Sequence, residues 1–399
     1  MALDSNRVII AGGGPVGLVA ALALGRAGIP VTVIEKGDGP QHDLRASTFH
    51  PPTLDMLDEF GITPKLIEHG LIAPTWQFRD RATGPVAVFD LGLLKDDTAH
   101  PYRVQCEQWK LVGFLMDEIA RLPDVEVLHG HALTSVEQDA AGVTVTAEAA
   151  DGPVRFAGRW LVGAEGARSP TRKTLGIGFD GMTLPELFLV VSTPFLFEDV
   201  FPQLSPINYM SDPDEWLVLL RTRDFWRVLI PADPNAGEEH LLSDAFVRAA
   251  LKRVHATAES APTLHRTLYP VHQRVASTYQ AGRVFLAGDS AHINNPLGGM
   301  GMNGGIHDAL ELARLLVEHW VADDPERLGV YTRRRRPVAY DEVQAATLRN
   351  RQILNERDPA VRNARLDDLR RTGADPVAAR NYLLKSSMIL GLRQAATVQ

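Results

Sequence analysis

The chain has 399 residues, which exceeds the usual size of one hydrophobic core, so we expect two domains. A formal net charge of -8 provides no basic field to attract nucleic acid or an anionic membrane surface, and we expect neither partner. The single cysteine, Cys106, excludes an intramolecular disulfide and a cysteine-ligated metal site, so we expect no metal and a cytoplasmic location.

The first predicted elements lie in residues 7–36, RVIIAGGGPVGLVAALALGRAGIPVTVIEK. The apolar run 8–11 predicts a buried parallel strand, and the stretch that follows predicts a helix to Ala27. A second strand is predicted for residues 31–34. This strand, helix, strand order is typical of a dinucleotide-binding unit.

The glycines between the first strand and the helix form a G-x-G-x-x-G pattern. Gly12 permits a tight turn, Gly14 lets a pyrophosphate approach the backbone, and Gly17 lets helix and strand pack closely. Glu35, at the end of the second strand, is placed to accept a hydrogen bond from a ribose hydroxyl. The pattern indicates a dinucleotide site but does not separate NAD from FAD.

The next elements alternate between helices and strands. A loop leads into an amphipathic helix after residue 50, and a hairpin is predicted near residues 75–90, with Thr83-Gly84 at its turn. Apolar spacing around Leu111 and Leu115 predicts a helix. Two or three strands follow between residues 125 and 148.

Two further motifs each join an apolar strand to a glycine-containing loop. The second is WLVGAEGARSPTR in residues 160–172, and the third is GRVFLAGDSAHINNPLGGMGMNGG in residues 282–305, with a helix expected from about Gly304. Between them the pattern is mostly strands, with helix predicted near residues 238–253. Helical periodicity dominates residues 329–399.

The three motifs, in this order, resemble those of the class A flavoprotein monooxygenases, the para-hydroxybenzoate hydroxylase group. The resemblance implies an α/β fold in which a Rossmann-like FAD-binding domain of the glutathione-reductase type is interleaved with a β-sheet substrate domain. The expected FAD domain comprises residues 1–73, 91–178 and 269–328. The expected substrate domain comprises residues 74–90 and 179–268, and residues 329–399 form C-terminal helices that can support a homodimer.

The resemblance also implies roles for individual residues. Glu35 holds the adenosine ribose, Asp289 binds the ribityl hydroxyls, and the Gly301 and Met302 amides face the flavin pyrimidine ring. The residues expected to contact FAD are Gly12, Gly14, Pro15, Val16, Gly17, Glu35, Lys36, Arg45, Gln108, Gly288, Asp289, Pro296, Gly299, Gly301, Met302 and Asn303.

Some of these residues have simpler interpretations. Arg45 can be an exposed loop arginine, Gln108 an ordinary polar position on a helix, and Asp289 a turn or cap residue. The family usually has Asp where this chain has Glu165, and the longer side chain displaces the carboxylate. His292 is expected to form structural hydrogen bonds.

The implied activity is NADH- or NADPH-dependent hydroxylation of an electron-rich phenol or hydroxypyridine with O2, through a flavin C4a-hydroperoxide in a dry chamber. The sequence does not separate the two nicotinamide donors. A reductase or dehydrogenase that does not activate oxygen is one alternative, and a flavin-dependent halogenase is a more distant one. The residues expected at the reaction chamber, by location alone, are His50, Tyr209, Arg221, Arg223 and Pro296.

Overall fold

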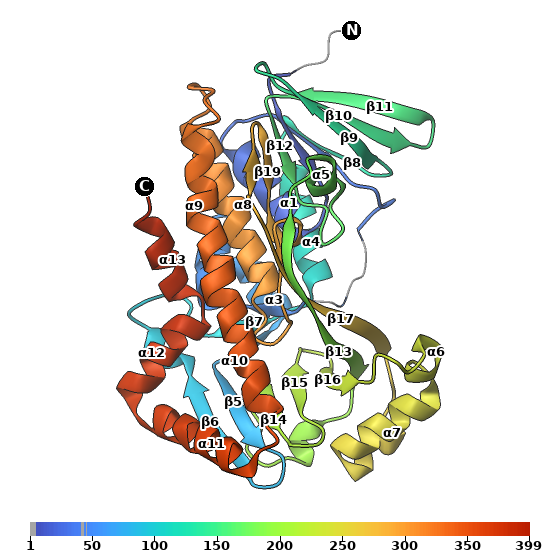
Figure 1. Ribbon diagram of the computed structural model, residues 1–399, viewed down its shortest axis with the longest axis vertical. Helices are drawn as coiled ribbons and strands as arrows, with labels where there is room; N and C mark the ends of the chain where they lie inside the picture. The colour runs from blue at the N-terminus through green and yellow to red at the C-terminus, as the bar shows by residue number, and fades with distance from the viewer. Residues whose placement is uncertain (1–4, 41–43, 45) are drawn as a thin grey trace.

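The computed structural model describes residues 5–40, 44 and 46–399. Its architecture is mixed α/β, as expected, and it is built around two large sheets (Figure 1). The first sheet has the order β18 (Gln280–Ala281), β19 (Val284–Leu286), β12 (Trp160–Gly163), β1 (Val8–Ala11), β2 (Val31–Ile34), β8 (Val125–Leu128). All its strand pairs are parallel except β18 with β19.

Strand alternation explains how this sheet is covered on both faces. Val8 and Ile10 of β1 face the core shared with helices α1 (Pro15–Arg26), α4 (Gln108–Ile119) and α8 (Gly301–Glu318). Ile9 and Ala11 face a second core under a three-stranded sheet. That sheet consists of β9 (Ala132–Gln138), β10 (Val143–Ala149) and β11 (Gly152–Gly158). Because both faces are covered, β1 and β2 are fully buried, as the predicted parallel strands require.

The second sheet contains the middle of the chain together with the predicted hairpin. Its order is β20 (His292–Ile293), β17 (His265–Ala276), β13 (Phe179–Thr193), β16 (Trp226–Ala232), β15 (Leu217–Arg221), β14 (Ile207–Ser211), β5 (Thr75–Asp80), β6 (Gly84–Asp90). The hairpin is confirmed as β5 and β6, and it joins the sheet through parallel pairing of β5 with β14. β17 crosses the boundary expected at residue 268. Helices α6 (Glu238–Leu241) and α7 (Asp244–Val254) lie beside this sheet (Figure 1).

The last of the C-terminal helices pack on the second sheet. α9 (Val330–Pro337), a π-helical segment η6 (Val338–Gln344) and α10 (Ala345–Leu354) follow one another from the upper to the lower half of the molecule (Figure 1). α11 (Pro359–Ala374), α12 (Pro376–Ser386) and α13 (Ile389–Ala396) complete the chain. Leu366, Leu383 and Ile389 share a core with Trp76 and Phe89 of the β5–β6 hairpin.

A small sheet lies between the two large ones. It has the order β3 (Thr48–Phe49), β7 (Arg103–Gln105), β4 (Leu71–Ala73), and helices α2 (Pro51–Asp58) and α3 (Thr63–His69) accompany it. A short helix, α5 (Pro170–Thr174), follows β12. The remaining elements are the 3-10 turns η1 (Leu91–Leu94), η2 (Phe197–Asp199), η3 (Ala256–Ser260), η4 (Gly288–Ser290) and η5 (Arg327–Gly329).

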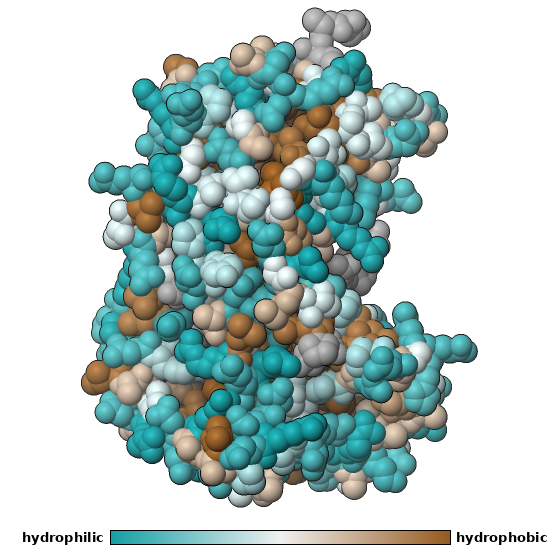
Figure 2. Space-filling model, in the orientation of Figure 1, coloured by the Kyte–Doolittle hydropathy of each residue, from teal (hydrophilic) through white to brown (hydrophobic). Residues whose placement is uncertain are grey.

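The surface agrees with a chain that buries its apolar residues internally. Figure 2 shows a mostly hydrophilic face on which apolar residues form separated groups. In the part of the chain that the structure describes, no helix is long and apolar enough to cross a membrane.

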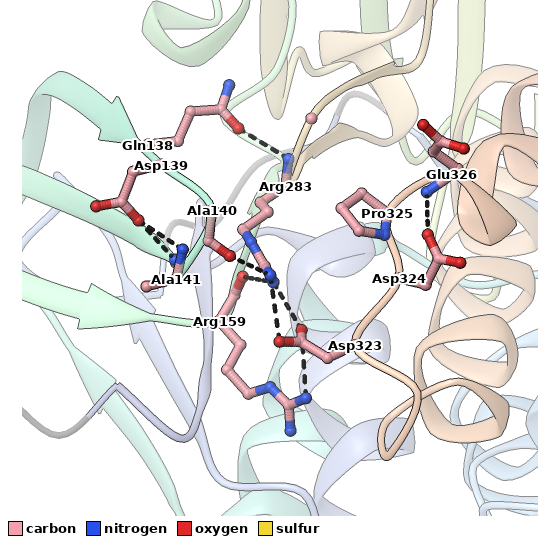
Figure 3. Close-up of polar contacts among 12 residues, drawn as sticks. Gln138, Asp139, Ala140, Ala141, Arg159, Arg283, Asp323, Asp324, Pro325 and Glu326 are labelled. Carbon is pink, nitrogen blue, oxygen red and sulfur yellow. Dashed lines mark hydrogen bonds and ion pairs between the residues drawn. The ribbon is translucent and has the colours of Figure 1, made fainter.

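An ion-pair network beside the first sheet joins Arg159, Arg283 and Asp323 (Figure 3). Arg283 donates through both terminal nitrogens to Asp323, at 2.7 and 3.2 Å, and also to the Ala140 carbonyl at 2.7 Å. Arg159 pairs with the same carboxylate at 3.2 Å. Arg283 is 5% exposed, so its charge depends on Asp323 for compensation.

We expect Asp323→Asn to lower the free energy of unfolding by about 1–2 kcal/mol at neutral pH, since the partly exposed carboxylate is screened but Arg283 is buried. Asn suits the positive φ of 49° at this position. The hydrogen bond from Arg283 lowers the pKa of Asp323. Its stabilisation is therefore complete above the unfolded-state pKa and is lost as the pH falls through the lower folded-state pKa.

Urea unfolding of both proteins between pH 3 and 7 measures this difference. Asp324→Asn is the matched control, because Asp324 accepts from the Glu326 amide and pairs with the exposed Arg327. Equal losses for both variants, or a difference that does not shrink in acid, would contradict the role given to Asp323.

Candidate functional site

The three sequence motifs meet at one edge of the first sheet. The backbone at the ends of neighbouring strands is hydrogen-bonded: Gly12 N to Ile34 O at 2.8 Å, Ala164 N to Ala11 O at 2.7 Å, and Ala287 N to Gly163 O at 3.0 Å. Carboxyl ends of parallel strands form the ligand-binding crevice of such sheets. The candidate site is therefore assembled from residues far apart in the sequence.

The first-motif glycines differ in what surrounds them. Gly12 has a φ of +109°, and a Cβ there would lie 2.4 Å from the Ala164 carbonyl oxygen. A Cβ on Gly17 would lie 1.9 Å from the Gly12 carbonyl oxygen, so helix α1 touches the turn. At Gly14, in contrast, a Cβ would meet nothing within 4 Å. The open space is thus at the glycine expected to face a pyrophosphate.

The start of α1 has the features of an anion-binding helix terminus. Gly14 is its N-cap, makes no side-chain cap and is followed by Pro15 at the first position, so the early amides point out of the helix. Glu35 lies beside them: its carboxylate accepts from Gly13 N at 2.7 Å and from Gly37 N at 2.8 Å. These bonds fix the Glu35 side chain next to the motif, and the adjacent Lys36 is exposed.

Glu165 stands where the family usually has Asp, and its carboxylate accepts hydrogen bonds from other residues of the protein. Its carboxylate accepts from Ser169 Oγ at 2.8 Å, from Thr171 N at 3.1 Å and from the Thr171 hydroxyl, and Ser290 Oγ approaches it at 3.3 Å. The longer side chain thus reaches the start of α5 and connects the second motif with the third.

The third motif rests on a buried charge network. Asp308 of α8 accepts from Gly288 N at 3.2 Å, lies 2.7 Å from His292 Nε2 and pairs with Arg335 at 2.6 Å. Burial opposes ionisation of Asp308, but Arg335 and His292 outweigh it and lower the pKa of that carboxyl. His292 therefore has the structural contacts expected of it. Asp289 is exposed at this edge, and its contact with the ribityl hydroxyls stays a prediction.

Hydrogen bonds hold the loop of residues 296–299, which is part of the third motif. The Asn303 side chain donates to Thr48 O at 2.8 Å and to Gly299 O at 2.6 Å, and it accepts from His50 N at 2.9 Å. His50 Nε2 lies 2.9 Å from Gly298 O, so this nitrogen carries the proton. Burial lowers the pKa of His50 well below its usual value, which keeps the ring neutral. Asn303 and His50 therefore position the loop.

α8 begins at Gly301, three residues before the start predicted from sequence. Gly301 and Met302 therefore occupy its first turn, where backbone amides have no partner within the helix. Their contact with a flavin ring stays a prediction. Val16 of α1 packs against this region: a Cβ on Gly288 or Gly305 would lie 2.9 or 2.6 Å from its side chain.

A cavity lies between this loop and the second sheet. Residues 296–299, which include Pro296 and Gly299, form one wall. The opposite wall is apolar and comes from β14, β15 and β16: Ile207, Val218, Leu220 and Leu229. The cavity therefore joins the flavin-loop candidate residues to the predicted substrate sheet.

The polar side chains of the cavity are Thr48, Arg103 and Tyr209. Burial raises the pKa of the Tyr209 phenol, while Arg103 and the Gly298 backbone oppose that shift. Burial lowers the pKa of Arg103, which the Tyr209 oxygen opposes. Tyr209 thus lies where the sequence placed it, as a neutral phenol next to a buried guanidinium.

The structure does not bring Arg221 and Arg223 to this cavity. Val218 and Leu220 of β15 face the cavity, so Arg221 lies on the opposite face, where it contacts Glu198 at 3.5 Å and the Trp226 ring. Arg223 is exposed and donates to the Glu68 carbonyl at 2.6 Å. The strand period, applied from Val218, could have excluded Arg221.

Two expected cofactor contacts have different outcomes. Gln108 begins α4, and its amide nitrogen donates to Ala46 O at 2.9 Å, while its half-buried side chain makes no hydrogen bond to the described residues. Arg45 lies outside the described residues.

Arg103 is the site residue that the sequence did not reveal. It belongs to the three-residue strand β7, which is too short for a periodic pattern. The only signal was an arginine next to the apolar Val104, shortly before the candidate Gln108.

Comparison with known proteins identifies the family. Residues 5–346 match the model of the FAD binding domain family. The chain belongs to this family, among the class A flavoprotein aromatic hydroxylases.

The hydroxylase is similar to several named proteins. It is 34% identical to the para-nitrophenol 4-monooxygenase of Pseudomonas sp. strain WBC-3, over 97% of this chain and 96% of that protein. It is 32% identical to the 6-hydroxy-3-succinoylpyridine 3-monooxygenase of Pseudomonas putida, over 78% and 79%. The crystal structure of p-nitrophenol 4-monooxygenase from Pseudomonas putida superposes with a TM-score of 0.91 at 30% identity, covering 97% and 98%.

The described residues fit FAD as the bound dinucleotide. The open space at Gly14, the outward amides of α1 and the fixed Glu35 carboxylate suit a pyrophosphate and its adenosine ribose. A Cβ on Gly288, Gly299 or Gly301 would lie 2.9–3.1 Å from the side chain of Val16, Thr48 or Asn294, so these glycines allow close packing within and around the third motif.

We expect Gly14→Ala to weaken FAD binding by about tenfold or more, because the methyl group occupies the space of a phosphate and blocks a charge-assisted backbone contact. The apoprotein should keep its thermal stability, since the φ of Gly14 is -79° and its Cβ position is open. Fluorescence titration with FAD and a thermal melt of the apoprotein measure the two effects.

Gly17→Ala is the contrasting variant, because its Cβ would collide with the Gly12 carbonyl oxygen. It should destabilise the apoprotein itself. Wild-type FAD affinity in Gly14→Ala would show that the pyrophosphate does not lie at this glycine.

Proposed function

We propose that this hydroxylase uses NADH or NADPH and O2 to add one hydroxyl group to an electron-rich single-ring aromatic, a phenol or hydroxypyridine. The observation that carries the proposal is the cavity between residues 296–299 and strands β14–β16. The names of the para-nitrophenol and hydroxypyridine monooxygenases to which the chain is similar support the substrate class.

Bound FAD supplies the redox chemistry, taking electrons from the nicotinamide donor and activating O2. We propose that it is held by the first-motif glycines, Glu35, Asp289 and the amides at the start of α8. Asn303 and His50 set the loop that faces its ring through their contacts with Gly299 and Gly298.

The cavity walls perform two tasks in this proposal. The apolar side chains on β14–β16 exclude water, which protects a reactive oxygen species from wasteful decay. The polar end, with Tyr209 and Arg103, orients the aromatic ring by its oxygen substituent. Pro296 lies on the loop side and limits how the ring approaches the flavin.

Purification and assay test this function directly. The protein should carry FAD, and a suitable phenol or hydroxypyridine should stimulate NAD(P)H oxidation with formation of a product heavier by one oxygen atom. A protein that cannot be loaded with FAD would overturn the proposal. Stimulated oxidation without hydroxylated product indicates a reductase or oxidase, and product that requires halide indicates a halogenase.

We expect Leu220→Ala to raise the fraction of NAD(P)H consumed without hydroxylated product, because a smaller side chain in the cavity wall admits water. The ratio of hydroxylated product to oxidised NAD(P)H measures this coupling. Leu219→Ala is the control on the same strand, since Leu219 packs in the core on the opposite face. It should cost about 2–5 kcal/mol of stability with coupling unchanged. The same coupling ratio in both variants would contradict a water-excluding role for this wall.

A further inference from the structure

Arg103 places a positive charge on the wall of the cavity. Its side chain comes from β7 and is 2% exposed. It lines the cavity together with Tyr209 and Gly298. A charge this deeply buried requires compensation from its surroundings.

The protein compensates this charge with neutral groups, among them the Tyr209 hydroxyl oxygen. Arg103 Nη2 donates to the Ser386 carbonyl over a long 3.4 Å, and the guanidinium lies 5.3 Å from the centre of the Trp76 ring. Its Nε has no hydrogen-bond partner. Among the described side chains, no carboxylate forms an ion pair with it.

The buried Arg335 and Arg283 differ in this respect, and Arg79 has neutral acceptors at shorter distances. Arg335 pairs with Asp308 at 2.6 Å, and Arg283 pairs with Asp323 at 2.7 Å. Arg79 is 4% exposed and donates to the carbonyls of Pro202 and Gln203 at 3.1 and 3.2 Å. Arg103 therefore combines deep burial, an orphaned nitrogen and an adjoining cavity.

The neighbouring surface extends the positive charge. A second hollow has Arg349, Lys385 and Tyr382 on its walls, and no acidic side chain among its lining residues. Arg103 donates a hydrogen bond to the carbonyl of Ser386, which lines this second hollow, so the two cavities lie close together. Although the chain has a net charge of -8, three cationic side chains line these two cavities: Arg103, Arg349 and Lys385. Such an arrangement favours a negatively charged ligand.

We propose that Arg103 binds an oxyanion of the aromatic substrate, a phenolate or a ring carboxylate, and so makes the enzyme prefer anionic over neutral rings. The proposal rests on the proposed function, because it takes the cavity as the substrate site. A guanidinium suits this task because its nitrogens donate in one plane to an anionic oxygen or carboxylate. Tyr209, next to Arg103, can donate its hydroxyl proton to the same oxyanion.

Three ligands with a common para-nitrophenyl scaffold separate charge from shape. 4-Nitrophenolate carries a phenolate, 4-nitrobenzoate a carboxylate and 4-nitrotoluene a neutral methyl group. The FAD-loaded full chain is titrated with each at a pH where both acids are ionised. Dissociation constants are read from the change in visible absorption of the flavin, without turnover.

We expect wild type to bind at least one anion more tightly than 4-nitrotoluene. Arg103→Gln should weaken that anion by about 10- to 100-fold and leave 4-nitrotoluene nearly unchanged. Loss confined to the phenolate or to the benzoate identifies which oxyanion is recognised. Arg103→Lys keeps the charge and should recover part of the preference, and it serves as the second variant if Arg103→Gln does not fold.

Arg79→Gln is the matched control, since it removes another buried arginine whose contacts lie away from the cavity. It should keep the anion preference of wild type. Equal weakening of all three ligands by Arg103→Gln, or no weakening of either anion, overturns the proposal. So does a wild type that binds neither anion better than 4-nitrotoluene.

The reduction potential and FAD content of Arg103→Gln provide an independent check. If either changes while the anion preference persists, Arg103 serves the flavin and the proposal is wrong. A wild type that holds FAD and makes hydroxylated product, but shows no anion preference, overturns this inference alone. A wild type without FAD or hydroxylated product instead overturns the proposed function.

Discussion

Close approach of backbone at the edge of the first sheet is the constraint on which the rest of the site depends. Gly17 allows α1 to touch the Gly12 turn, Gly12 allows that turn to touch Ala164, and Gly305 allows α8 to reach Gly288. Any side chain at these positions would separate the three motifs by the width of a methyl group or more. The glycines thus bring the ends of four strands and two helices together without using space that a dinucleotide needs.

A buried polar network stabilises this edge of the sheet. Asp308 is fully buried and contacts the Gly288 amide, His292 and Arg335, so one carboxylate links α8, the third motif and α9. Such a network is costly when a partner is removed, which gives the arrangement a single geometry. Glu165 links the second and third motifs in a similar way, because it accepts hydrogen bonds from Ser169, Thr171 and Ser290.

Much of this architecture could be predicted from sequence, and the reasons are physical. The strands at residues 8–11 and 31–34 are confirmed because both are continuous apolar runs bounded by glycine or charge. β11 was not predicted, since its sequence GPVRFAG lacks clear alternation. The start of α8 at Gly301 was predicted three residues too late, because glycine has a low helix propensity and this first turn is rich in glycine.

The substrate side was less predictable for a different reason. Tyr209 and Pro296 line the cavity, whereas Arg221 and Arg223 do not. The face of the sheet to which a side chain points depends on the strand register, and the register is fixed only when the strands pair. Arg103 comes from a strand of three residues whose partners, Phe49 and Ile72, flank Val104 in space but not in sequence. Such a residue is found only when the sheet is assembled.

The long strands β13 and β17 give the molecule a mechanical property. They pair at eleven positions, and β17 also pairs with β20, which lies within the third motif. Figure 1 shows both strands running from the upper half of the molecule into the lower half. The two halves are therefore joined by antiparallel pairing on both sides of a register shift between Thr183 and Leu187. Any movement of one half relative to the other has to bend these two strands or break their hydrogen bonds.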